Sequence, residues 1–156
     1  MSAAPAAERD DVADLAARCI AALRVGDRVS RDLGISLDST GPGRISLSMA
    51  VVEKMVNAYE ICHGGYIFTL ADTAFAYAAS TRNNVAVGMG CHIDYLRPAV
   101  KGDRLHANAV VSHAGKTTGV VKVSVVDHQG RAVAELQGRY YNVGRRIVDE
   151  SEMAVA

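Results

Sequence analysis

Near the start of the chain, apolar residues recur three or four positions apart, at Val12, Leu15, Ala16, Cys19 and Leu23. This spacing predicts an amphipathic helix that has Asp10 or Asp11 as its N-cap and ends near Gly26. Residues 1–30 are therefore expected to form an N-terminal tail and helix.

Alternation of apolar and polar residues marks six strands in the next part of the chain. Two of them, 35–39 and 44–51, lie on either side of a Thr-Gly-Pro-Gly turn and predict a hairpin. Four more follow at 85–97, 104–113, 119–127 and 131–141. The connections between these four are short and contain glycine, which predicts antiparallel neighbours in chain order.

Between the two groups of strands, residues 65–79 are apolar on nearly every side. A helix of that kind is expected to be buried on all sides. Because antiparallel strands need a cover for one face, we expect an α+β fold in which an antiparallel sheet wraps around this helix. The domain is expected to span residues 31–144, followed by a loose, polar C-terminal tail at 145–156.

The composition limits the classes of function. At 156 residues the chain is long enough for one domain with a buried core. Its 17 basic and 17 acidic side chains cancel, which argues against nucleic acid or a membrane as partner, since both attract a surplus of Lys and Arg. Three widely spaced cysteines predict neither a disulfide framework nor a zinc site, and the N-terminus lacks a signal-peptide pattern. A cytoplasmic protein is therefore expected.

Asp72 is the only charged residue in the apolar 65–79 segment, and it lies near the middle. At that place it caps neither end of the helix, and burying a carboxylate without a partner is costly. Two interpretations stay open. Asp72 is either a functional carboxylate or a structural one that accepts hydrogen bonds from a neighbouring strand or another subunit.

A Cys-His-Gly-Gly sequence at 62–65 precedes the same helix. The backbone N–H groups of consecutive glycines are unshielded, and here they lie at the positive end of the helix dipole. That arrangement suits a developing oxyanion or another negative group. A plain glycine turn before a helix is the alternative interpretation.

The spacing of these two features has a consequence for assembly. Gly64 and Asp72 are eight residues apart, hence about 12 Å along a helix axis. An oxyanion donor and a base that serve one carbonyl must each come within about 3 Å of their atoms. If the two residues act together, Asp72 of one subunit should face Gly64 of another across a two-fold axis, and function requires a homodimer.

These motifs together resemble a known family. They are Asn57, the His-Gly-Gly at 63–65, the Leu-Ala-Asp-Thr-Ala-Phe-Ala-Tyr-Ala at 70–78 and the Ile-Asp-Tyr-Leu-Arg-Pro at 93–98. The chain resembles the hotdog-fold acyl-CoA thioesterases over about residues 34–143, most closely those of phenylacetic-acid degradation. The resemblance implies a long central helix wrapped by a curved antiparallel sheet, dimers that pair their sheets edge to edge, and homotetramers built from them.

The resemblance also implies catalytic roles. Asp72 is the implied catalytic carboxylate, as a general base on water or as a nucleophile. The amide of Gly64 polarises the thioester carbonyl, Asn57 orients the carbonyl or the attacking water, and His63 positions the site. Some relatives carry Ser or Thr early in the next strand, where this chain has Gly-Met-Gly at 88–90, so that role does not carry over.

Coenzyme A is expected as part of the substrate, with no separate cofactor and no metal. The resemblance implies that its path is lined by Gly90, Tyr95, Arg97, Gly115, Lys116 and Thr117. Arg97 and Lys116 have the charge to pair with its phosphates, although a solvated charge at a strand end is the alternative. No pair of histidines has the spacing of metal ligands.

The function implied is hydrolysis of an aromatic acyl-CoA, of the hydroxyphenylacetyl type. Phe68, Phe75, Tyr66 and Tyr77 are candidates for an acyl pocket, or are ordinary core residues. Two other functions stay open: a non-catalytic acyl-CoA sensor, and a hydroxyacyl-thioester dehydratase that uses His63 with Asp72 of the partner subunit.

Overall fold

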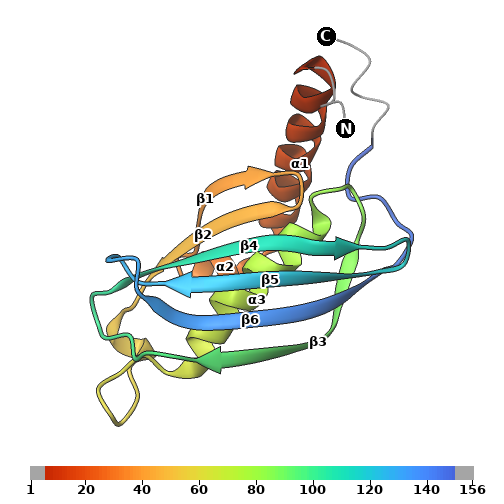
Figure 1. Ribbon diagram of the computed structural model, residues 1–156. Helices are drawn as coiled ribbons and strands as arrows, with labels where there is room; N and C mark the ends of the chain where they lie inside the picture. The colour runs from red at the N-terminus through yellow and green to blue at the C-terminus, as the bar shows by residue number, and fades with distance from the viewer. Residues whose placement is uncertain (1–5, 150–156) are drawn as a thin grey trace.

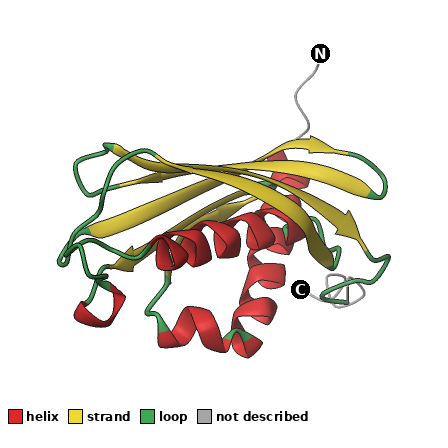
Figure 2. Ribbon diagram, turned by 90° about the horizontal axis from the view of Figure 1, so that it is seen from below, coloured by secondary structure: helices red, strands yellow, loops and turns green. Residues whose placement is uncertain are grey.

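The computed structural model describes residues 6–149, which form one curved antiparallel sheet with helices on one face (Figures 1 and 2). The helices are α1 (Ala6–Gly26), α2 (Arg28–Asp32), the short 3-10 helix η1 (Glu53–Met55) and α3 (Gly64–Ser80). The strands are β1 (Ser36–Gly41), β2 (Arg44–Ala50), β3 (Ala86–Tyr95), β4 (Arg104–Ala114), β5 (Thr118–Val126) and β6 (Ala132–Asn142). The predicted fold class, a sheet wrapped around a central helix, is confirmed.

The order of strands in the sheet is β1-β2-β4-β5-β6-β3. The prediction that the last four strands are neighbours in chain order is therefore wrong for β3 and β4. β3 pairs with β6, and β4 pairs with β2 and β5. The connection at 96–103 is long enough to pass the two intervening strands, because three strand spacings amount to only about 15 Å. β3 thereby becomes an edge strand.

The core lies between α3 and the concave face of the sheet (Figure 2). From α3 it receives Ile67, Leu70, Ala71, Ala74, Phe75 and Ala78, and from the sheet chiefly Leu47, Met49, Leu105, Val121, Val123 and Leu136. Each of these side chains is nearly or fully buried. Burying a large aliphatic side chain is worth about 1.5–3 kcal/mol, so this contact fixes the position of α3.

The other face of α3 is only partly covered. Thr69, Asp72, Thr73 and Ala76 are half-buried, so the helix is not buried on all sides within one chain. The Thr73 hydroxyl donates to the carbonyl of Thr69 at 2.8 Å, as a threonine in a helix interior commonly does. The partly covered face includes the one carboxylate of the helix.

The N-terminal region differs from its prediction. Helix α1 begins at Ala6, before the predicted caps, and the short helix α2 was not predicted. The Asp27 carboxylate caps α2 and accepts a hydrogen bond of 2.6 Å from the Tyr77 hydroxyl of α3. These bonds hold α2 beside α3. The predicted domain boundary after residue 30 falls inside α2, and the three-part division of the chain stays a prediction.

Asn83, just after α3, is fully buried and holds the start of the predicted C-terminal tail. Its side-chain oxygen accepts from the amides of Ile147 and Val148, at 2.9 Å each. Residues 150–156 of that tail lie outside the described residues. Among residues 6–149, no helix is long and apolar enough to span a membrane.

Gly138 of β6 lies where the sheet meets the ring of Phe75. A Cβ atom at this position would lie 2.7 Å from the ring. We expect Gly138→Ala to lower the free energy of unfolding by about 1–3 kcal/mol, the usual cost of overpacking a core. Urea denaturation measures the change. Gly41→Ala is the matched control, because a Cβ at this strand glycine meets nothing within 4 Å, and an equal effect of both substitutions would contradict the packing argument.

Candidate functional site

Asp72 lies in the middle of α3 on the face turned away from the core. It lines a hollow of about 420 Å³ together with Phe75, Ala76, Gly88, Met89, Gly90 and Cys91, which we call the Asp72 hollow. The half-buried carboxylate makes no hydrogen bond within residues 6–149, so no neighbouring strand of its own chain explains it. Burial raises the pKa of Asp72 above its ordinary value of 3.8. A carboxylate so placed is a stronger base than an exposed one.

Cys91, on β3, is a site neighbour that sequence reasoning missed. Burial and the nearby negative charge of Asp72 both raise the pKa of its thiol. The signal in the sequence was proximity alone, since Cys91 directly follows Gly90, which was already a candidate. Cys91 lines the Asp72 hollow and is not suited to act as a nucleophile, because a raised pKa keeps its thiol protonated.

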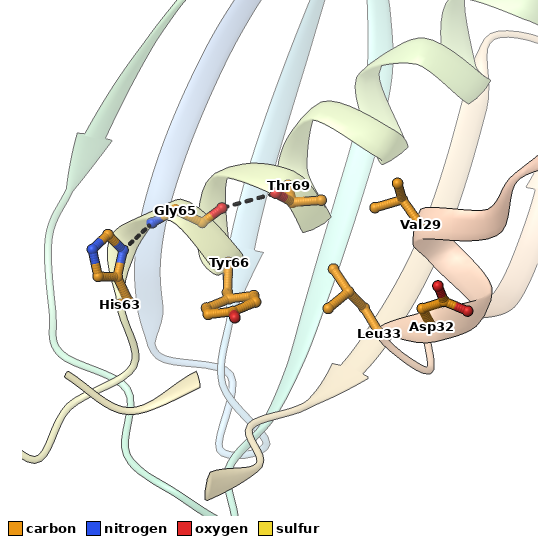
Figure 3. Close-up of a pocket in the computed structure, with 7 residues that line it drawn as sticks. All are labelled: Val29, Asp32, Leu33, His63, Gly65, Tyr66 and Thr69. Carbon is orange, nitrogen blue, oxygen red and sulfur yellow. Dashed lines mark hydrogen bonds between the residues drawn. The ribbon is translucent and has the colours of Figure 1, made fainter. Parts of the chain in front are cut away.

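At the N-terminus of α3, His63 is the capping residue (Figure 3). Its Nδ1 accepts the N–H of Gly65 at 2.9 Å. Accepting through Nδ1 puts the proton of the neutral ring on Nε2. The N–H of Gly64, one residue earlier, makes no hydrogen bond to any described residue. It is a free donor at the positive end of the helix dipole.

Asn57 shares a hollow of about 400 Å³ with Gly64. The other residues that line this Gly64 hollow are Ile61, Cys62, Ile67, Tyr95, Leu96, Arg97 and Pro98. The side-chain oxygen of Asn57 accepts from the amides of Tyr59 and Ile61, at 2.9 and 3.4 Å. Its amide nitrogen has no partner among the described residues. Asn57 is therefore available to a ligand as a donor.

The Gly64 hollow and the Asp72 hollow are separate and share no lining residue. This matches the distance of about 12 Å along the helix between Gly64 and Asp72. Within one chain, the structure thus brings Asn57, Gly64, Tyr95 and Arg97 together, but not with Asp72 or Gly90.

The candidates for the coenzyme A path lie at opposite ends of the sheet. The 115–117 turn contacts Asn142 at one end of β6, where the amide of Asn142 donates to the carbonyl of Thr117 at 2.7 Å. Arg97 lies at the other end and donates to the carbonyl of Ala132 at 3.1 Å. The span between them along β6 is roughly 30 Å, since a strand rises about 3.3 Å per residue. One chain does not bring Arg97 and Lys116 to a common phosphate.

A third hollow, the α2–α3 cleft, opens between α2 and the first turns of α3 (Figure 3). It measures about 400 Å³ and is lined by Val29, Asp32, Leu33, His63, Gly65, Tyr66 and Thr69. Its walls are mainly apolar, and α2, which forms one of them, was missed in the sequence because a five-residue helix has no measurable periodicity.

The four aromatic candidates for an acyl pocket do not gather in one place. Phe75 is buried and lines the Asp72 hollow, whereas Tyr66 lines the α2–α3 cleft. The hydroxyl of Tyr77 bonds to Asp27, and Phe68 is half-buried against the core.

Within residues 6–149, no group of three or more His, Cys, Asp or Glu side chains is arranged to hold a metal ion.

Comparison with known proteins gives the family. The model of the thioesterase superfamily matches residues 59–134. The acyl-coenzyme A thioesterase PaaI of Escherichia coli is 41% identical over 130 residues, which cover 83% of this chain and 93% of that protein. The human acyl-coenzyme A thioesterase 13 is 32% identical over 125 residues, which cover 78% and 88%.

Solved structures agree with the sequence relatives. The structure of the E. coli PaaI protein superposes with a TM-score of 0.85 at 38% identity, covering 86% of this chain and 98% of that one. A Streptococcus mutans protein solved with bound acetyl-CoA has a TM-score of 0.70 at 32% identity, with coverage of 72% and 90%. This chain therefore belongs to the hotdog-fold thioesterase superfamily and is an acyl-CoA thioesterase.

Proposed function

We propose that the protein hydrolyses aromatic acyl-CoA thioesters of the phenylacetyl class, at sites that two subunits share. The observation that carries the proposal is Asp72, a half-buried carboxylate with a raised pKa and no hydrogen-bond partner in its own described chain. Burying a charged group without a partner costs stability, which favours a role in binding or reacting with a ligand. Asn57 and Gly64 supply N–H donors that no described residue occupies, of the kind that a carbonyl oxygen needs.

In the proposed reaction, the thioester carbonyl oxygen accepts the N–H of Gly64, with Asn57 donating to the same oxygen or to the attacking water. Asp72 of the partner subunit takes a proton from water as the water oxygen bonds to the carbonyl carbon. When the tetrahedral intermediate collapses, the carbon–sulfur bond breaks and the proton passes to the leaving thiolate of coenzyme A. Direct attack by the carboxylate, through an acyl-enzyme anhydride that water then hydrolyses, is the other route open to Asp72.

The edge strand β3 supports a homodimer. Among residues 6–149 it pairs only with β6, on one side, and its exposed residues include the apolar Val87, Met89 and Tyr95. An unpaired edge of this length is a template for another strand. If two copies pair β3 antiparallel about a two-fold axis, the Tyr95 end of one lies beside the Ala86 end of the other.

That pairing would bring together two pairs of residues that lie far apart within one chain, Gly64 with Asp72 and Arg97 with Lys116. The Asn57 and Gly64 end of one subunit approaches the Asp72 hollow of its partner. Arg97 likewise approaches the partner's 115–117 turn, with Lys116, so that both cations border one coenzyme A path. We propose Gly90, Tyr95, Gly115 and Thr117 as the remaining lining of this path, and a homotetramer of two such dimers as the full assembly.

The aromatic acyl group is proposed from two observations. The ring of Phe75 lines the Asp72 hollow, next to the small Ala76. The E. coli protein of similar structure comes from the phenylacetic acid degradation operon, which supports a role in phenylacetate degradation for this chain. We assign the activity to the cytoplasm, the compartment expected from the sequence.

The other two functions have less support. The Nδ1 atom of His63 accepts from Gly65, so its Nε2 carries the proton and is no base for a dehydratase. A sensor that only binds acyl-CoA has no use for the Asp72 carboxylate, which has no hydrogen-bond partner in the described part of the chain.

We expect Asp72→Asn to lower kcat/KM for acyl-CoA by about 100- to 10,000-fold, the range typical of a lost general base, while the fold and the dimer persist. Release of free thiol from a panel of aryl and alkyl acyl-CoA esters measures the rate. Asp14→Asn is the control, because Asp14 is an exposed carboxylate of α1. Near-normal hydrolysis by the Asp72 variant would refute the proposed role. The panel also tests the aryl preference, which equal rates on alkyl esters would contradict.

The pH dependence follows from the burial of Asp72. Only the carboxylate form accepts a proton from water, so the rate should fall as the pH drops through the pKa of this group. Since burial raises that pKa in the free protein, the acid limb of kcat/KM should have its midpoint above 3.8. Initial rates from pH 3 to 8, with circular dichroism to verify folding, test this. A midpoint at or below 3.8 in folded protein contradicts it.

Mixing two inactive variants tests the shared site. Asn57→Ala and Asp72→Asn are co-expressed, and each alone is expected to be nearly inactive. In a heterodimer, one site contains both substitutions and the other contains neither. Random pairing should therefore restore about one quarter of the wild-type activity. If each site came from a single chain, every site would carry one substitution and no activity would return.

A further inference from the structure

We propose that Tyr95 is a positioning residue that, together with His63, fixes the direction of the Gly64 N–H. This inference rests on the proposed role of that N–H as the donor to the thioester carbonyl. It assigns Tyr95 to the oxyanion site rather than to the coenzyme A path alone.

The argument begins with one peptide group. The hydroxyl of Tyr95 donates to the carbonyl oxygen of Gly64 at 3.1 Å. The N–H of the same peptide group belongs to Gly65 and donates to Nδ1 of His63 at 2.9 Å. The peptide between Gly64 and Gly65 is therefore held at both ends by side chains. We call this arrangement the Tyr95–His63 clamp.

The clamp matters because of the residue that it adjoins. Glycine has no Cβ atom to restrict its backbone angles, and two consecutive glycines make this turn the least restrained part of the α3 N-terminus. The N–H of Gly64 belongs to the preceding peptide group, which shares its Cα atom with the clamped one. Holding one peptide plane limits the rotation of the other. An oxyanion donor needs such a fixed direction before the substrate arrives.

Tyr95 also acts through its shape. A Cβ atom on Gly64 would lie 3.1 Å from Cζ of Tyr95, so the ring covers the Cα atom of Gly64 at close contact. With a side chain at this position, the ring would have to shift by a few tenths of an ångström. The N–H of Gly64 itself has no hydrogen-bond acceptor among residues 6–149, so it stays available to a ligand.

The place of Tyr95 in the fold gives the clamp a second role. Tyr95 is the last residue of β3, the edge strand proposed to pair in the dimer. Its side chain links that edge to the first turn of α3, which comes from a distant part of the sequence. Ordering the end of β3 on dimerisation would thus order the oxyanion donor as well.

Tyr95→Phe tests the clamp, because it removes the hydroxyl and retains the ring. We expect kcat to fall about 3- to 10-fold, which corresponds to one hydrogen bond, with KM within twofold of wild type. A rise in KM at unchanged kcat would assign Tyr95 to substrate binding and overturn the proposal, as would no change in either constant.

Tyr77→Phe is the matched control. Tyr77 lies in α3, and its hydroxyl, like that of Tyr95, makes one hydrogen bond, but to Asp27 and more than three turns from Gly64. This substitution should lower the stability and leave kcat unchanged. An equal loss of kcat in both variants would indicate a general effect on the helix and overturn the specific role of Tyr95.

A second measurement does not depend on turnover. In ¹⁵N-glycine-labelled protein, Tyr95→Phe should shift the amide resonance of Gly65 and increase its rate of hydrogen exchange, because both report on the clamped peptide group. An unchanged Gly65 signal would overturn the clamp even if kcat fell. If the clamp signals change but Asp72→Asn still hydrolyses acyl-CoA, the clamp stands and the proposed function fails, so the two failures are distinguishable.

Discussion

The burial of one face of α3 against the concave side of the sheet is the constraint on which the site depends. Leu70, Ala74 and Phe75 fix the rotation of the helix about its axis, because their side chains are buried only when this face of the helix packs against the sheet. Asp72 then lies on the opposite face of the helix. The N-terminus of α3 lies beside the end of β3, where Tyr95 bonds to Gly64. The apolar core thus positions both candidate functional parts of the helix, the Asp72 carboxylate and the N-terminal Gly64.

The same packing explains the chemistry of Asp72. A carboxylate near the middle of a helix is far from the dipole ends that would stabilise its charge. Partial burial removes water without supplying a hydrogen bond, so the pKa rises. A stronger base is the result, at some cost in stability. The core contacts of α3 offset that cost, since several large side chains each contribute about 1.5–3 kcal/mol.

Periodicity predicted six strands, the central helix and the fold class, because a half-buried strand and a buried helix each have a distinct pattern. It did not predict the position of β3, since pairing between distant strands leaves no period in the sequence. The short helix α2 was missed because five residues are too few to show a period. The partly covered face of α3 was missed because nearly all residues of this helix are apolar, so the sequence does not distinguish its covered face from its open one. In the site, the motifs indicated Asn57, Gly64 and Asp72, whereas the separation of Arg97 from Lys116 became evident only from the register of β6.

In the proposed dimer, the edge position of β3 connects assembly with catalysis. One side of β3 completes the sheet through β6, and the other side has no partner within the described chain. An edge of ten residues with exposed apolar side chains favours association. Tyr95 ends this strand and also bonds to the turn that carries the free N–H of Gly64. Under the proposed function, a subunit alone would lack two things: a partner's carboxylate that faces the Gly64 donor, and a fixed strand end that holds the direction of this donor. The proposed β3 pairing would meet both needs through one symmetric contact, and catalysis and dimerisation would then depend on the same strand.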